Sequence, residues 1–113
     1  MKNELEKDIE RKLRQMIEKA GGRCLKWVCP GWSGVPDRLI LLPGGRVYFV
    51  ETKRPRGGRL GKMQIKWREW LTALGFSYSV VWNDADLADF KDLIFPREIT
   101  LGECYAVIEK LRR

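Results

Sequence analysis

Residues 38–52 constrain the fold of this chain most strongly, because they read as two apolar strands joined by a tight turn. The Pro-Gly-Gly sequence at 43–45 favours a turn. The second strand is rich in the β-branched and aromatic side chains that strands prefer. A hairpin centred on Gly44 pairs residues equidistant from it, so the sequence predicts that Asp37 lies opposite Glu51.

Three charged side chains converge where these two strands end. Directly opposed residues have Cβ atoms about 4.5–5.5 Å apart, and Glu51 and Lys53, two residues apart, point to one face of the sheet. Two carboxylates this close repel each other unless a cation lies between them. A divalent metal with oxygen ligands fits that place, and the lysine suits a negatively charged substrate such as a phosphate.

These residues resemble the motif of the PD-(D/E)XK nucleases, in which Pro-Asp is followed by Glu-X-Lys after a hairpin. A longer pattern resembles the VRR-NUC family, especially its small stand-alone phage members, over residues 4–90. It comprises Gly34-Val-Pro-Asp37, Leu-Pro-Gly-Gly-Arg-Val, Val-Glu51-Thr-Lys53, Leu60, Gln64, Trp67, Leu71 and Gly75-Phe.

The resemblance implies roles for five of these positions. Asp37, Glu51 and the backbone carbonyl of Thr52 would bind Mg²⁺ or Mn²⁺. Lys53 would orient the attacking water or stabilise the developing charge. Gln64 would contact the water or the scissile phosphate.

The family also places a glutamate from the first helix in its active site. Apolar side chains recur at helical spacing over residues 3–20. At 100° per residue, Glu6 lies closest of the acids to the centre of this stripe, and Glu10 lies farther round. The resemblance therefore assigns the role to Glu6, with Glu10 as the second candidate.

The net charge of +7 is concentrated in one stretch. Residues 53–68 hold seven basic residues and no acid, whereas the rest of the chain holds 15 of each. A basic stretch beside a carboxylate pair is typical of a protein that binds a polyanion. We expect Arg54, Arg56, Arg59 and Lys62 to contact DNA phosphates without reading sequence.

The remaining patterns complete an α/β prediction. The expected order is a restriction-endonuclease-like αβββαβ core, with a mixed central sheet flanked by helices, followed by a C-terminal helix. A single domain spans 1–113, with a core of about 4–94 and an extension of 95–113. The expected elements after the first helix are strands 24–29, 38–42 and 46–52, helix 62–74, strand 76–82, and helices 84–94 and 102–113.

Tryptophans mark two further places. Helix 62–74 carries a stripe that includes Trp67, Trp70 and Leu74, and this stripe is expected to pack in the core. Trp32 lies in a glycine-flanked loop. It would either cover the core or stack on a base or sugar of a nucleic acid.

Composition excludes several other classes of protein. The chain has no histidine, which excludes histidine-based acid–base catalysis and histidine-ligated zinc. Cys24, Cys29 and Cys104 form no metal-binding pattern and are expected to be free thiols. No apolar run reaches the roughly 18 residues of a membrane span, and the charged N-terminus does not resemble a signal peptide. We expect a cytoplasmic protein, in the host cytoplasm if a phage encodes it.

The resemblance implies a metal-dependent endonuclease that cuts branched DNA, as Holliday junction resolvases do. The alternatives are a flap nuclease, a sequence-specific or RNA-directed restriction-type nuclease, and a nucleic-acid-binding module without catalysis. A junction has two strands to cut, so a homodimer is expected. The apolar side chains of residues 95–113 would form the dimer interface or pack on their own domain.

Overall fold

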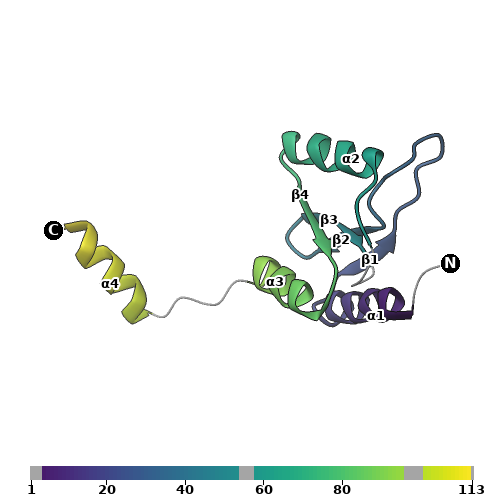
Figure 1. The fold of residues 1–113 in the computed structure, drawn as a ribbon. Helices are drawn as coiled ribbons and strands as arrows, with labels where there is room; N and C mark the ends of the chain where they lie inside the picture. The colour runs from purple at the N-terminus through teal and green to yellow at the C-terminus, as the bar shows by residue number, and fades with distance from the viewer. Residues whose placement is uncertain (1–3, 54–57, 96–100, 113) are drawn as a thin grey trace.

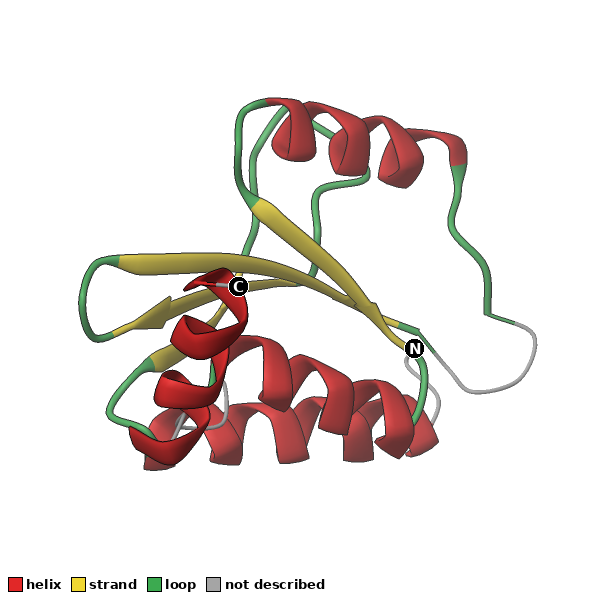
Figure 2. Ribbon diagram, turned by 90° about the vertical axis from the view of Figure 1, so that its left-hand side faces the viewer, coloured by secondary structure: helices red, strands yellow, loops and turns green. Residues whose placement is uncertain are grey.

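A computed structural model describes residues 4–53, 58–95 and 101–112 and shows a sheet between two layers of helices (Figures 1 and 2). The order of elements is the predicted one, which confirms the α/β fold class with its mixed sheet. The elements are α1 (Glu4–Lys19), β1 (Arg23–Lys26), β2 (Arg38–Leu42), β3 (Arg46–Thr52), α2 (Lys62–Ala73), β4 (Ser77–Val81), α3 (Asp84–Ile94) and α4 (Leu101–Arg112).

The sheet has the strand order β1-β2-β3-β4. Strands β2 and β3 are antiparallel, with Arg38 opposite Val50 and Leu42 opposite Arg46. This register is centred on Gly44, as predicted from the turn. Strand β4 runs parallel to β3, because α2 carries the chain back over one face of the sheet before β4 begins.

Helices α1 and α3 cover one face of the sheet and enclose the main core (Figure 2). The buried side chains of α1 are Ile9, Leu13 and Ile17, one helical turn apart. Leu5, on the first turn of the same stripe, is 58% exposed. The first turn of α1 therefore projects beyond the core, and burial begins only at the second turn.

Helix α2 covers the opposite face, and its apolar stripe is less buried than the sequence predicts. Leu71 is buried, but Trp70 is 42% exposed and Leu74 is 72% exposed. The prediction that this whole stripe packs in the core is therefore wrong. Among the described residues α2 is the only helix on this face (Figure 2), so its apolar stripe is wider than its line of contact with the sheet.

Strand β1 is shorter than predicted and ends at Lys26. The Trp27 N–H still donates to the Asp37 carbonyl, with 2.9 Å between N and O. The return bond of this antiparallel pair is not made, because the Asp37 N–H donates to the Glu51 carboxylate rather than to the Trp27 carbonyl. Cys29 consequently lies in the following loop, so the expectation of a strand that extends over 24–29 is wrong at its C-terminal end.

The described cysteines are free thiols, as expected. Cys24 is buried, and burial raises its pKa to about 11, so the thiol stays neutral at physiological pH. Cys29 is half-buried. The side chain of Cys104 lies outside the described residues.

The loop between β1 and β2 packs directly on the start of α2. Gly34 has φ +79°, and a Cβ on it would lie 2.5 Å from Cβ of Met63 and 2.9 Å from the backbone nitrogen of Gln64. Only glycine combines this φ with such a close approach. The contact fixes the loop that leads into Asp37 against the first turn of α2.

Helix α4 stands apart from the sheet (Figure 1). The radius of gyration is 16.9 Å, whereas a compact chain of this length has about 13 Å. Ile108 and Leu111 are exposed, so they do not pack on their own domain, whereas Phe95 packs against the core. Within the described ranges, no helix has the length and apolar character needed to cross a bilayer.

Candidate active site

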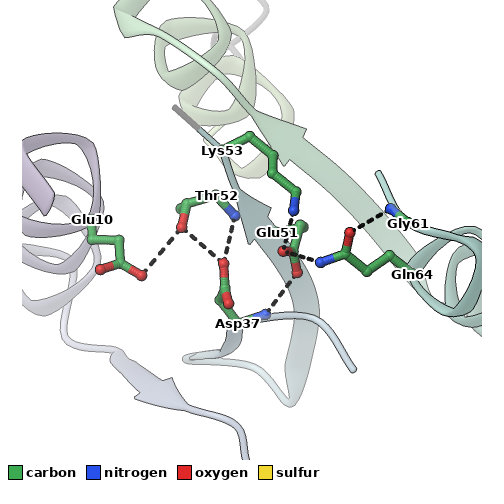
Figure 3. Close-up of polar contacts among 7 residues, drawn as sticks. All are labelled: Glu10, Asp37, Glu51, Thr52, Lys53, Gly61 and Gln64. Atoms are coloured by element: carbon green, nitrogen blue, oxygen red, sulfur yellow. Dashed lines mark hydrogen bonds and ion pairs between the residues drawn. The ribbon is translucent and has the colours of Figure 1, made fainter. Parts of the chain in front are cut away.

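Glu51, at the end of β3, is the most buried charged residue of the site, with 2% of its surface exposed. Its Oε2 accepts the N–H of Asp37 at 3.1 Å, and its Oε1 accepts Nε2 of Gln64 at 2.8 Å. The ammonium of Lys53 lies 3.6 Å from the same Oε1. Figure 3 shows these groups converging on one carboxylate. Burying a carboxylate is costly unless such donors and cations surround it.

Asp37 lies beside Glu51 because the β2–β3 register, continued by one residue, places the two opposite each other. Its Oδ2 accepts the backbone N–H of Thr52 at 3.0 Å and lies 2.9 Å from the Thr52 hydroxyl oxygen. Thr52 is fully buried. The sequence assigned only the backbone carbonyl of Thr52 to the site, whereas the structure shows that its side chain and N–H also orient Asp37.

The first helix reaches this network through Glu10. Oε1 of Glu10 lies 3.2 Å from the Thr52 hydroxyl and 3.8 Å from Nε of Arg38. Glu6, the first choice from sequence, lies one turn nearer the N-terminus, about 6 Å along the helix axis. The structure thus joins the second candidate, Glu10, to Thr52 and Asp37 (Figure 3).

Gln64 holds Glu51 in place from the opposite layer. Its Oε1 accepts the backbone N–H of Gly61 at 2.8 Å, which caps the start of α2, while its Nε2 donates to Glu51. Because one end of the amide must accept and the other must donate, its orientation is defined. Gln64 therefore links the cap of α2 to the Glu51 carboxylate.

Tyr78, on β4, is a neighbour of the site that the sequence did not single out. It pairs with Phe49 across β3 and β4, so it lies on the same face as α2. Its hydroxyl is buried and has no hydrogen-bond partner among the described residues. Burial raises its pKa, and the negative charges of Glu51 and Asp37 raise it further. Only the strand register could have indicated this position.

Two of the four predicted phosphate-binding residues lie in the part of the chain that the structure describes. Arg59 and Lys62 are exposed at and just before the start of α2. Arg54 and Arg56 lie outside the described residues.

The oxygen donors of the site fit Mg²⁺ or Mn²⁺. Within residues 4–53, 58–95 and 101–112, no group of three or more histidine, cysteine or acidic side chains gathers as a ready metal site. Mg²⁺, however, is usually held by one or two carboxylates and otherwise by waters and substrate phosphate. Asp37, Glu51 and the neighbouring main chain of Thr52 provide this kind of set.

Comparison with known proteins gives two similarities. The chain is 41% identical over 83 residues to "Putative nuclease p44" of Acyrthosiphon pisum secondary endosymbiont phage 1, covering 74% of this chain and 87% of that protein. It also superimposes on a solved structure described as a VRR_NUC domain, with a TM-score of 0.70 and 27% identity. That match covers 82% of this chain and 97% of the solved one. No family model matches the chain.

The Thr52 hydroxyl should contribute measurably to stability. Replacing Thr52 by valine keeps the shape but removes the donor that lies between Asp37 and Glu10. We expect the free energy of unfolding in urea to fall by about 1–3 kcal/mol, because a buried acceptor loses its partner. The control is Thr72→Val on the exposed side of α2, with an expected change of at most about 0.5 kcal/mol. Equal effects of the two substitutions would contradict the proposed hydrogen bonds.

Proposed function

Because this chain belongs to the VRR-NUC family of phage-type nucleases, we propose that it is a metal-dependent endonuclease that hydrolyses phosphodiester bonds in branched DNA. The observation that carries the proposal is the buried carboxylate of Glu51, held within hydrogen-bonding or ion-pair distance of Asp37, Lys53 and Gln64. A protein that only binds DNA has no need of buried carboxylates beside its phosphate-binding residues, since they repel the ligand.

The role proposed for each residue follows from these contacts. Asp37, Glu51 and the Thr52 carbonyl would hold Mg²⁺ or Mn²⁺. The bound ion would lower the pKa of a bound water and would offset charge on the phosphate. Lys53 would stabilise charge developing in the transition state, because its ammonium is held at the edge of the carboxylate pair. Gln64 would keep Glu51 oriented through its two hydrogen bonds.

The distribution of basic residues supports contact with DNA on both sides of the site. Arg59 and Lys62 are exposed beside α2. On the α1 side, a hollow of about 280 Å³ is lined by Lys7, Glu10, Arg11, Arg14 and Arg38. The charge count of the sequence did not reveal this second region, because acidic residues elsewhere on α1 balance its cations. A strand that crosses the site would meet phosphate-binding residues before and after it.

Branched DNA is the substrate class we favour, with a Holliday junction as its leading member. Contacts to phosphates position DNA but carry no sequence information, and the described basic residues form no recognisable base-reading module. A flap nuclease or a restriction-type nuclease is the main alternative. The action of the protein in the cytoplasm, or in the host cytoplasm, stays a prediction.

The first test is cleavage of labelled four-way junction, flap, splayed-arm and linear duplex DNA with Mg²⁺, with Mn²⁺ and with a chelator. We expect the metals to support cleavage of the branched substrates. Asp37→Asn and Glu51→Gln should abolish cleavage and still bind DNA, because each removes a proposed metal ligand. Asp92→Asn, an exposed acid on α3, is the matched control and should cut normally.

Three results would separate the alternatives. Cleavage that persists in both variants would remove the metal assignment. Binding without cleavage by the unaltered protein in either metal would favour a binding module. Preference for linear duplex or flap over the junction would favour the other nuclease classes.

A second test decides which acid of α1 acts in catalysis, and here we propose Glu10 on the basis of its contact with Thr52. Glu10→Gln should lower the single-turnover cleavage rate at saturating DNA by about a hundredfold, the scale of a lost proton-transfer or water-orienting group. Glu6→Gln should change it less than about threefold. The reverse order of effects would return the role to Glu6.

We also propose that the protein is a homodimer, because a four-way junction presents two strands for symmetric cleavage. Closed two-fold symmetry is the commonest arrangement of soluble oligomers. The exposed side chains of Ile108 and Leu111 support an interface there, because α4, which carries them, stands clear of the sheet (Figure 1).

Light scattering at micromolar concentration should therefore give twice the 13.2 kDa mass of one chain. Replacing Ile108 and Leu111 together by glutamate should return the mass to that of one chain, because like charges would then face each other. Glu109→Ala, an exposed position on the same helix, should leave the dimer intact. A monomeric unaltered protein would remove the dimer and weaken the resolvase assignment.

A further inference from the structure

Three tryptophans form a cluster on the α2 side of the molecule. Trp32 comes from the β1–β2 loop, and Trp67 and Trp70 come from α2. Their ring centroids lie 5.4–6.3 Å apart, with interplanar angles of 79–89°. Such edge-to-face packing holds indole rings in defined orientations.

Protein contacts hold the cluster on its inner side, and its outer side is exposed to solvent. Trp67 donates its indole N–H to the Ser33 carbonyl at 3.0 Å and also packs against Trp27. Trp32 is 56% exposed and Trp70 is 42% exposed. Trp67 therefore supports the rings of Trp32 and Trp70, which expose a contiguous aromatic surface to solvent. An exposed apolar patch of this kind is typical of an interaction site rather than of a core.

The cluster lies next to the catalytic groups. Trp67 is three residues after Gln64 on one helix, and Gln64 donates to Glu51. Trp70 is about 9 Å farther along the axis than Gln64, from 1.5 Å per residue. Trp32 lies five residues before Asp37, in the loop that packs on Met63 and Gln64.

Positively charged side chains on α2 lie between the candidate active site and the tryptophan cluster. Lys62, Lys66 and Trp70 follow one another at intervals of four residues, so they share one side of α2, and all three are exposed. Helix α2 carries Lys62, Lys66 and Arg68 against the single acid Glu69. Aromatic rings beside a basic track are the combination by which proteins hold single-stranded nucleic acid.

We propose that Trp32 and Trp70 stack on unpaired bases of the DNA strand that runs from the cleaved phosphate along α2. This inference rests on the proposed nuclease function and adds the feature of the substrate that the site recognises. Bases within a duplex are already stacked on each other, so only bases that are unpaired at a branch or an end can stack on the tryptophans. The cluster thereby selects DNA structure rather than sequence, because every base has a face for stacking.

A second copy of this chain fits the same surface less well. In a two-fold interface the same patch faces itself, so the lysines of one α2 would approach those of the other. Opposed like charges are unfavourable in an interface. The phosphates of a strand, by contrast, complement them.

The test is binding in a chelator, so that no DNA is cut and affinity is measured independently of cleavage. Fluorescence anisotropy would use a duplex, a splayed-arm DNA, and the same splayed-arm DNA with abasic sites in the unpaired arms. Trp32→Ala and Trp70→Ala should each weaken binding to the normal splayed arm by about tenfold, within the range measured for stacking contacts. Their affinity for duplex should change less than about twofold.

The abasic DNA makes the test independent of how well a variant folds. It retains every phosphate but lacks the bases, so the unaltered protein should bind it about a hundredfold more weakly than the normal splayed arm, which is about tenfold for each tryptophan. Each single alanine variant should lose about half of this preference on a logarithmic scale, and the variant with both Trp32→Ala and Trp70→Ala should not distinguish the two DNAs. Trp32→Phe and Trp70→Phe should keep most of the preference, and Leu74→Ala, at an exposed residue just after the end of α2, should keep all of it.

Equal binding of normal and abasic arms by the unaltered protein would overturn the proposal, as would equal losses on duplex and splayed-arm DNA. A change in mass of the Trp70→Ala protein by light scattering would instead assign the cluster to contact between copies. If the preference for unpaired bases holds but no metal supports cleavage, the proposed catalysis fails while the stacking site remains.

Discussion

The burial of one carboxylate, that of Glu51, is the constraint on which the rest of this structure depends. A charged group with 2% exposure must be matched by donors and cations, or it destabilises the fold. The partners of Glu51 come from three separate places: the backbone of Asp37 across the hairpin, Lys53 on its own strand, and Gln64 on α2. The hairpin register, the end of β3 and the docking of α2 therefore have to be correct together.

The alternation of side chains along β3 then divides the site between the two layers of helices. Glu51 points toward α2, whereas Thr52 points toward α1 and lies between Asp37 and Glu10. The site is consequently neither on one face of the sheet nor in a closed pocket, but at the end of the strands where both layers can reach it (Figure 3). This position leaves the proposed catalytic groups open to a long substrate that passes from one layer to the other, with basic residues on each side.

Much of this arrangement was predictable from local sequence. A tight turn with two glycines fixes the hairpin register, and the register fixes which residues oppose each other, so the pairing of Asp37 with Glu51 needed no structure. The errors have a different origin. Strand β1 ends early because the Asp37 N–H donates to the Glu51 carboxylate rather than to the neighbouring strand. The stripe of α2 is partly exposed because only one helix covers that face.

By itself, the sequence determined the order of elements, the mixed sheet and the opposition of Asp37 and Glu51 across the hairpin, because turn chemistry and the periodicity of strands and helices are local properties. Only the tertiary structure decided the position of α1, along its own axis, relative to the sheet. Helical periodicity gives the direction in which Glu6 and Glu10 point but not their height along the helix axis, and packing that begins at Ile9 brings Glu10 to Thr52. The exposure of Trp32 was likewise decided by packing, since a single loop residue has no periodicity from which burial could be read.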